Sequence, residues 1–445
     1  MEGPYLRHWL KTWRRGRDGA PFMGARGTTT SLLAFTLAGA FVGAGAGAAS
    51  ADEQGVKVEW DPGPKLSFMD GRFTVQLRGQ LQIDYVYVAG ARGAIDDSDI
   101  DARRARLGIE GEIGNRLEYE FEVDFADDGV AVTDAFVAVR AIGPLTFVVG
   151  QFETPNSFSE QTSSEVTTFM ERPQFTDAFN LDRRLGVAAR LDGERWHVKA
   201  GAFFQNIDTE NGAVPDKNTW GAVAARGHYA FALADGDWFH LGTSIRYRDC
   251  DNTVDSASAC GDGEVRYRER PFFRSTSVRT VDTETIEDMR SDLFWGPEIG
   301  VFYGPFAFKS EAGLLWGSRD NADADDFGPL WGVYADVAYF LTGESQPYDE
   351  KRGELDRPKV KNPVFKGGWG AWEIAARFDY LSLEDDGSAI DGGRQWIVVA
   401  GVNWWLNQRM KLQANYAHTQ VKGGPLATNG SYGVDGVGLR AQLDW

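Results

Sequence analysis

The chain contains the stretch 103-RRARLGIEGEIGNRLEYEFEVDF-125, in which two alternating runs flank the dipeptide Gly114-Asn115. Apolar side chains such as Leu107 and Phe121 occupy one parity of these runs, and charged side chains occupy the other. A period of two is that of a β-strand, so the stretch predicts a hairpin with one apolar and one charged face. A soluble sandwich would turn the apolar face inward, whereas a transmembrane barrel would turn it toward lipid. The alternation by itself leaves both open.

Repetition of this pattern along the whole chain favours an all-β transmembrane antiparallel β-barrel. Residues 266–270 could be a loop or a strand, which gives sixteen or seventeen strands. Bacterial single-chain barrels use even numbers, so we predict sixteen, with all short turns at the periplasmic end and all long loops outside. Facing and boundaries within 132–152 stay open because the parity there is mixed. The other expected strands are 73–87, the two of the opening hairpin, 132–141, 145–152, 184–191, 196–204, 220–230, 239–248, 293–303, 306–316, 331–341, 372–380, 396–404, 410–416 and 432–445.

The N-terminal region has the layout of an export signal. Basic residues including Arg14 and Arg26 precede an apolar run from Leu32 to Val42, and small residues end it at Ala49-Ser50-Ala51. We therefore predict a signal peptide over 1–51, a periplasmic lead-in over 52–72 and a barrel over 73–445, in the bacterial outer membrane. Met1 and Met23 both remain candidate starts. No later apolar run approaches the roughly 18 residues that a spanning helix needs.

Charge and residue usage exclude several classes of function. The net charge of −19 argues against nucleic acid as a partner. Five scattered histidines and two cysteines offer no metal cluster, and we expect no cofactor. An exported chain with Cys250 and Cys260 so close together most simply closes a loop with one disulfide. No nucleophile elbow or paired-carboxylate signature stands out, so we expect no enzymatic activity, although an outer-membrane barrel enzyme is a weaker alternative.

Several motifs resemble the phosphate-selective porin O and P family. They are the segment from Gly63 to Asp84, Arg103-Arg104-Ala105, Val149-Gly-Gln-Phe-Glu-Thr-Pro155, Thr162-Ser-Ser-Glu-Val-Thr-Thr-Phe-Met-Glu-Arg172 and Arg184-Leu-Gly186. The resemblance spans nearly the whole mature chain. It implies a sixteen-stranded trimeric outer-membrane porin whose third loop folds into the pore as its constriction. The insertion 153–182, which interrupts the strand pattern, would be that loop.

The resemblance also implies a site for anions such as phosphate. Arg103 and Arg104 match the family's paired arginines, Ser163 stands where its loop serine does, and Asp134 matches its aspartate. The family's loop lysine is absent, because Glu160 and Gln161 occupy that region and Glu165 follows. These loop acids oppose an anion, so we predict a weakly anion-preferring or mixed channel, with a general porin for small polar solutes as the alternative.

Inward parity adds further arginines to the expected site. Arg106 projects from the same strand as Arg104, and Arg184 follows the inserted loop. Rings of arginine select anions and rings of carboxylates select cations, so the arrangement at the narrowest point decides selectivity. A second set, at the outer mouth, would collect anions; alternatively, these arginines would face lipopolysaccharide of the surrounding membrane or tether the loop. This outer-mouth set consists of Arg266, Arg268, Arg270 and Arg274.

Overall fold

The computed structural model describes residues 56–60, 63–90, 95–126, 129–204, 206–207, 221–234, 236–250, 263–274, 276–321, 325–427 and 430–445. All of them belong to one compact unit, Gln54–Trp445. No helix in this described part is long and apolar enough to span a membrane.

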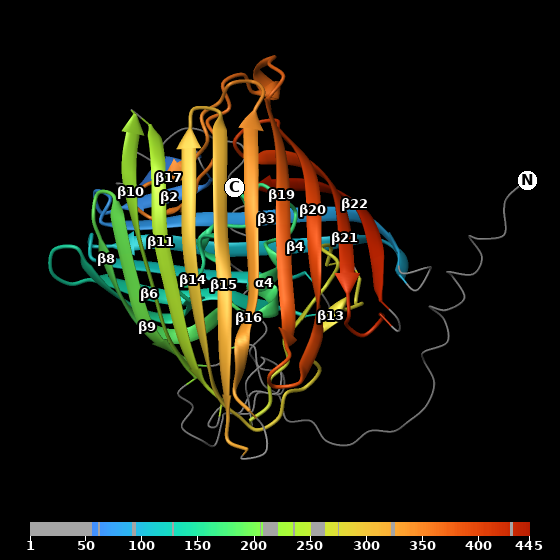
Figure 1. Cartoon of the computed structure of the whole chain (residues 1–445). Helices are drawn as coiled ribbons and strands as arrows, with labels where there is room; N and C mark the ends of the chain where they lie inside the picture. The colour runs from blue at the N-terminus through green and yellow to red at the C-terminus, as the bar shows by residue number, and fades with distance from the viewer. Residues whose placement is uncertain are drawn as a thin grey trace, which may run out of the picture. The chain divides into compact units, whose positions relative to one another are not determined.

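Sixteen antiparallel strands form a closed barrel, as predicted (Figure 1). Each strand pairs with the next along the chain, and the last strand pairs with the first, from Val434 opposite Gly90 to Asp444 opposite Gln80. The strands are β3 (Phe73–Gly90), β4 (Ile95–Ile113), β5 (Leu117–Asp124), β6 (Ala131–Arg140), β7 (Leu145–Glu153), β8 (Arg183–Asp192), β9 (Trp196–Phe203), β10 (Ala222–Ala234), β11 (Asp237–Asp249), β14 (Met289–Tyr303), β15 (Phe306–Arg319), β16 (Phe327–Phe340), β19 (Ala371–Asp385), β20 (Ile390–Trp405), β21 (Met410–Lys422) and β22 (Ser431–Asp444).

Burial along the strands shows which face the barrel turns outward. On β3, Leu81 and Ile83 are 37% and 45% exposed, whereas Gln80 and Gln82 are 2% and 0% exposed. Apolar side chains therefore cover the outside and polar side chains fill the inside, the reverse of a soluble sandwich. This inversion settles the alternative that the alternating pattern left open.

The barrel has one end with mostly short connections. Gly114 and Asn115 both have a positive φ, 62° and 59°, in the three-residue turn that joins the paired residues Ile113 and Leu117, and Gly and Asn are the residues that adopt this conformation most readily. The turns at 143–144 and 304–305 lie at the same end, which we call the short-turn end. One long connection, 341–370, also lies there, so the prediction that all long loops occupy the other end is wrong. This connection does not behave as a turn because it packs Tyr348 and Leu355 in an apolar cluster with barrel residues.

Six further short strands lie outside the barrel count. β1 (Lys57–Glu59) and β2 (Lys65–Phe68) extend the edge of β3. β12 (Arg268–Glu269) pairs only with β13 (Val281–Asp282), so residues 266–270 belong to a loop, as the even strand count required. β17 (Tyr348–Asp349) and β18 (Glu354–Leu355) form a small hairpin within the connection 341–370.

Candidate functional site

The segment between β7 and β8, residues 154–182, contacts inward-facing side chains from many strands. Ser157 caps α3 (Phe158–Gln161) by accepting from two backbone N–H groups, and α4 (Gln174–Ala178) follows. Main-chain groups of the segment bond to the wall, as when Asn415 Oδ1 accepts from the Met170 N–H at 2.8 Å. Arg440 and Arg246 in turn donate to carbonyl oxygens of the segment. The segment is thus fixed to strands on several sides of the barrel interior.

Two cavities lie along the described interior. The first, about 690 Å³, is lined by wall arginines and by residues of the long connection between β11 and β14, so it lies toward the long-loop end. The second, about 1000 Å³, includes Lys65 and Gly71 in its lining and lies toward the short-turn end. Both linings contain the same five residues, which we call the shared set: Arg104, Arg106, Ser164, Arg172 and Arg183.

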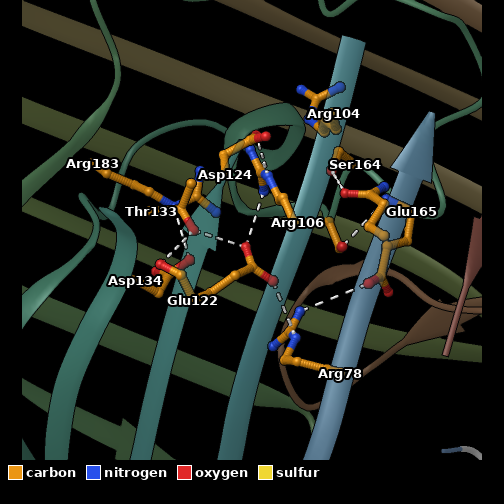
Figure 2. Close-up of polar contacts among 12 residues, drawn as sticks. Arg78, Arg104, Arg106, Glu122, Asp124, Thr133, Asp134, Ser164, Glu165 and Arg183 are labelled. Carbon is orange, nitrogen blue, oxygen red and sulfur yellow. Dashed lines mark hydrogen bonds and ion pairs between the residues drawn. The ribbon is translucent and has the colours of Figure 1, made fainter. Parts of the chain in front are cut away.

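Three arginines of the shared set are paired with carboxylates, and Figure 2 shows the surroundings of two of them, Arg106 and Arg183. Arg106 Nε lies 2.8 Å from Asp124 Oδ2, and Glu122 is 3.3 Å from the same guanidinium. Arg183 bonds to Asp134 at 3.0 Å and to Glu153 at 2.7 Å. Arg172 Nε lies 3.3 Å from Glu160 Oε1. The charges of Arg106 and Arg183 are therefore largely offset by their partners.

Arg104 differs from the other three arginines. Its Nη1 donates to Gln82 Oε1 at 2.8 Å, its Nε is buried without a hydrogen-bond partner, and within the described ranges no carboxylate lies at ion-pair distance. Gln82 Nε2 donates to the carbonyl oxygen of Ser164 at 3.2 Å and to Gln442 Oε1 at 2.9 Å. Gln82 therefore holds the uncompensated cation of Arg104 beside Ser164 of the inserted loop.

The remaining residues that we expected at the site differ in which of the two cavities they line. Arg103 lines only the first cavity and forms two hydrogen bonds to the Glu171 carboxylate, at 3.0 and 3.1 Å. Ser163 lines only the second cavity, as does Asp134. Arg184 is buried and lines neither cavity, whereas its neighbour Arg183 lines both.

The two loop acids are neutralised in different ways. Burial raises the pKa of Glu160 to about 8, and the nearby Arg172 only partly offsets that effect. Glu165 forms an ion pair with Arg357 of the connection 341–370 and lies 3.8 Å from Arg78. Both acids thus present less negative charge to a passing ion than the sequence suggested.

The outer-mouth arginines gather around the first cavity. Arg266, Arg268, Arg270 and Arg274 all line it, together with Arg279. Cys250 is buried at the end of β11, but Cys260 lies outside the described residues, so the disulfide stays a prediction.

Sequence reasoning did not include two contributors to this region. One is Arg172 in the Met-Glu-Arg motif; its motif was noticed, but its role was not. The other is the hairpin of β17 and β18, whose tip is held by Arg226 donating to the Gly353 carbonyl at 2.7 Å and by a 3.1 Å contact from His228 Nε2 to the Glu350 carbonyl. Lys351 of this hairpin lines the second cavity. No periodic signal marked the hairpin, because its strands are two residues long.

A closed sixteen-stranded barrel with an apolar outside and a charged interior defines an outer-membrane porin. The chain belongs to the phosphate-selective porin O and P family, which it matches over residues 75–445. In such barrels the short-turn end faces the periplasm.

Known proteins agree with this assignment. A Caulobacter vibrioides protein described as uncharacterized is 30% identical over 404 residues, covering 87% of this chain and 77% of that protein. Porin O of Pseudomonas aeruginosa is 25% identical over 434 residues, covering 90% and 94%. The structure of an anion-selective porin from Comamonas acidovorans aligns with a TM-score of 0.52 at 13% identity, over 83% of this chain and 100% of that one, which supports the fold.

Proposed function

We propose that this porin is an anion-preferring diffusion channel whose constriction lies at the shared set. The observation that carries this proposal is that four arginines and one serine, with no carboxylate, are the residues common to both cavity linings. An ion crossing between the cavities would pass these side chains. Rings of arginine at such a point favour anions.

Charge along the path supports the same direction. Ten arginines and six carboxylates line the described part of the first cavity, so an anion entering from outside meets a positive field. The second cavity carries eleven basic and ten acidic side chains in its described lining, a nearly balanced surface. Selection would therefore take place at and above the shared set, and the second cavity would pass ions with little preference.

Arg104 is the side chain that we expect to interact most directly with a passing anion. Its guanidinium has free donors and no competing carboxylate in the described structure, whereas Arg106 and Arg183 are already paired. Charge-assisted hydrogen bonds from a guanidinium suit phosphate as well as chloride. The description of the family, phosphate-selective porin O and P, and the anion-selective neighbour are consistent with such a preference.

The residues of this constriction do not favour tight binding of phosphate. Glu160 stands on the loop beside Arg172, where a lysine would instead add a cation. When it is ionised, the Glu160 carboxylate reduces the attraction by its charge, whereas the hydrogen bonds of Arg172 go to the main-chain carbonyls of Ser159 and Thr162. We therefore propose that the channel weakly prefers anions and that phosphate passes through it without binding at a high-affinity site. The balanced second cavity favours general passage of small polar solutes as the second candidate function.

Reversal potentials across a planar bilayer with a salt gradient test this proposal. We expect the purified porin to prefer chloride over potassium, and Arg104→Gln to shift the reversal potential toward cations. Arg140→Gln is the matched control, since Arg140 is an exposed arginine that already pairs with Glu112 and Glu118. Equal reversal potentials for the wild type and Arg104→Gln would place the constriction elsewhere.

We further propose that the mature chain begins near Asp52 and assembles as a homotrimer among outer-membrane lipid and lipopolysaccharide. The short strands β5 to β9, of 8 to 10 residues, make a low wall with exposed apolar side chains such as Phe121 and Phe147, which a neighbouring barrel could cover. N-terminal sequencing of the outer-membrane protein and its migration before and after heating test both points. An N-terminus at Met1, or a monomer in unheated samples, would contradict them.

A further inference from the structure

The second half of the periplasmic connection 341–370 reaches the outside of the barrel. The carbonyl oxygen of Trp369 accepts hydrogen bonds from Nε1 of Trp372 at 3.2 Å and from Nε1 of Trp404 at 2.8 Å. These two indoles stack at 5.0 Å between centroids and stand on the outward parity of β19 and β20. Residues 359–370, which we call the rim segment, therefore lie beside the lipid-facing surface at the periplasmic end.

The rim segment is held in one shape while it exposes large aromatic side chains. The N–H of Val364 bonds to the Leu406 carbonyl and that of Gly370 to the Asn362 carbonyl, both at 2.8 Å. Phe365 and Trp369 are nevertheless 65% and 72% exposed. Aromatic side chains at barrel ends usually lie at the level of the lipid headgroups. At this position the two rings would therefore lie in the membrane–water interface.

The charge of the rim segment is opposite to that of the chain. The net charge of the protein is −19, but residues 359–370 contain three lysines and no acidic residue. Lys359, Lys361 and Lys366 are exposed, and within the described ranges none of them pairs with a carboxylate. Glu344, which accepts from the backbone N–H of Lys361 at 3.1 Å, is itself buried. The segment thus presents uncompensated positive charge beside exposed aromatic rings.

We infer that the rim segment binds anionic phospholipid headgroups in the periplasm-facing leaflet. Phe365 and Trp369 enter the interfacial layer of the membrane, and the long side chains of the three lysines reach the lipid phosphate groups. A second copy of the chain fits this surface less well, because the copy would bring the same unpaired lysines. In addition, the Trp369 carbonyl joins the segment directly to the lipid-facing indoles of Trp372 and Trp404.

The first test compares lipid retention by native mass spectrometry. The mature porin is released from micelles that contain phosphatidylglycerol and phosphatidylcholine in equal amounts at low salt. We expect the wild type to retain phosphatidylglycerol preferentially. In Lys361→Gln/Lys366→Gln that preference should fall about 25-fold, because each lysine near an anionic surface contributes about fivefold. Lys351→Gln/Arg352→Gln is the matched control, since it removes two charges from the lumenal half of the same connection.

A second measurement reports position independently of charge. In vesicles that contain brominated phosphatidylglycerol, the quenched part of the tryptophan fluorescence should fall in Trp369→Phe relative to the wild type. Heat-modifiable migration confirms that each variant is folded. The inference is overturned if the lysine variant keeps the wild-type lipid preference, if the lumenal control loses it equally, or if Lys366→Cys cross-links between copies in the presence of lipid.

Discussion

Arg104 and Gln82 form a single hydrogen bond, 2.8 Å from Nη1 to Oε1, that joins the uncompensated cation of the shared set to the strand beside it. Gln82 bonds at the same time to the Ser164 carbonyl of the inserted loop. The glutamine thus links the arginine to the loop, so the anion preference that we propose would depend on a residue that carries no charge.

Replacement of Gln82 by leucine should weaken anion preference without removing a charge. The substitution leaves Arg104 without its described acceptor and the Ser164 carbonyl without its side-chain donor, and each buried unsatisfied group costs about 1–3 kcal/mol. We expect a reversal potential between those of the wild type and Arg104→Gln. Gln76→Leu, on the same strand but lining only the second cavity, is the control. A Gln82→Leu channel with wild-type selectivity would show that Arg104 needs no positioning.

Glu160→Lys should create a block of chloride current by phosphate. The new cation would stand beside Arg172 and close to Arg104 in a narrow, partly dehydrated passage, where charge-assisted bonds to a multivalent anion are strong. Glu160→Gln separates the two effects, since it removes the carboxylate without adding a cation and should raise anion preference only slightly. Conductance is measured in chloride with increasing phosphate. A wild-type channel already blocked by micromolar phosphate would show that the acid at this position does not matter.

Anion preference should fall as the pH rises from 6 to 9. Burial raises the pKa of Glu160 to about 8, so the side chain is mainly neutral at pH 6 and mainly charged at pH 9. Its ionisation adds one negative charge beside Arg172, among Glu153, Asp177 and Asp182, which disfavour that charge. Reversal potentials measured at several pH values should therefore move toward cations with a midpoint near 8. The Glu160→Gln channel should show no such step; an equal step in that variant would assign the titration to another group.

The barrel could be predicted from sequence because its signal is periodic. The alternation that places Leu81 outward and Gln82 inward recurs along the long strands, because lipid lies on one side of the wall and water on the other. Local register shifts interrupt it, as between Gln82 and Ile83. The connection 341–370 could not be predicted in this way. Its β17 and β18 are two residues each, and its shape depends on contacts with Arg226 and His228, which are far away in sequence.

The strand pattern could predict only those residues of the candidate site that lie well within strands, because the alternation along a strand shows which side chains point inward. Arg104 and Arg106 share the inward parity of β4, and both belong to the shared set. Arg183 stands at the start of β8, where the chain leaves the loop and parity no longer decides direction, so Arg184 was chosen in its place. Pairing could not be predicted either, because the partner of each arginine lies on a neighbouring strand or on the loop.

The outer-mouth arginines should differ in their effect on conductance according to their partners. Arg266 forms two hydrogen bonds with the buried carboxylate of Asp282, at 2.6 and 2.7 Å, so its charge is largely offset. Arg268 is exposed on β12 and, within the described ranges, pairs with no carboxylate. At 0.1 M salt, where screening acts over about 10 Å, Arg268→Gln should lower anion conductance by about twofold and Arg266→Gln by much less. At 1 M salt, where that distance is about 3 Å, both variants should match the wild type. A salt-independent loss in Arg268→Gln would indicate an altered pore, and no loss at 0.1 M would favour lipopolysaccharide as the contact of this arginine.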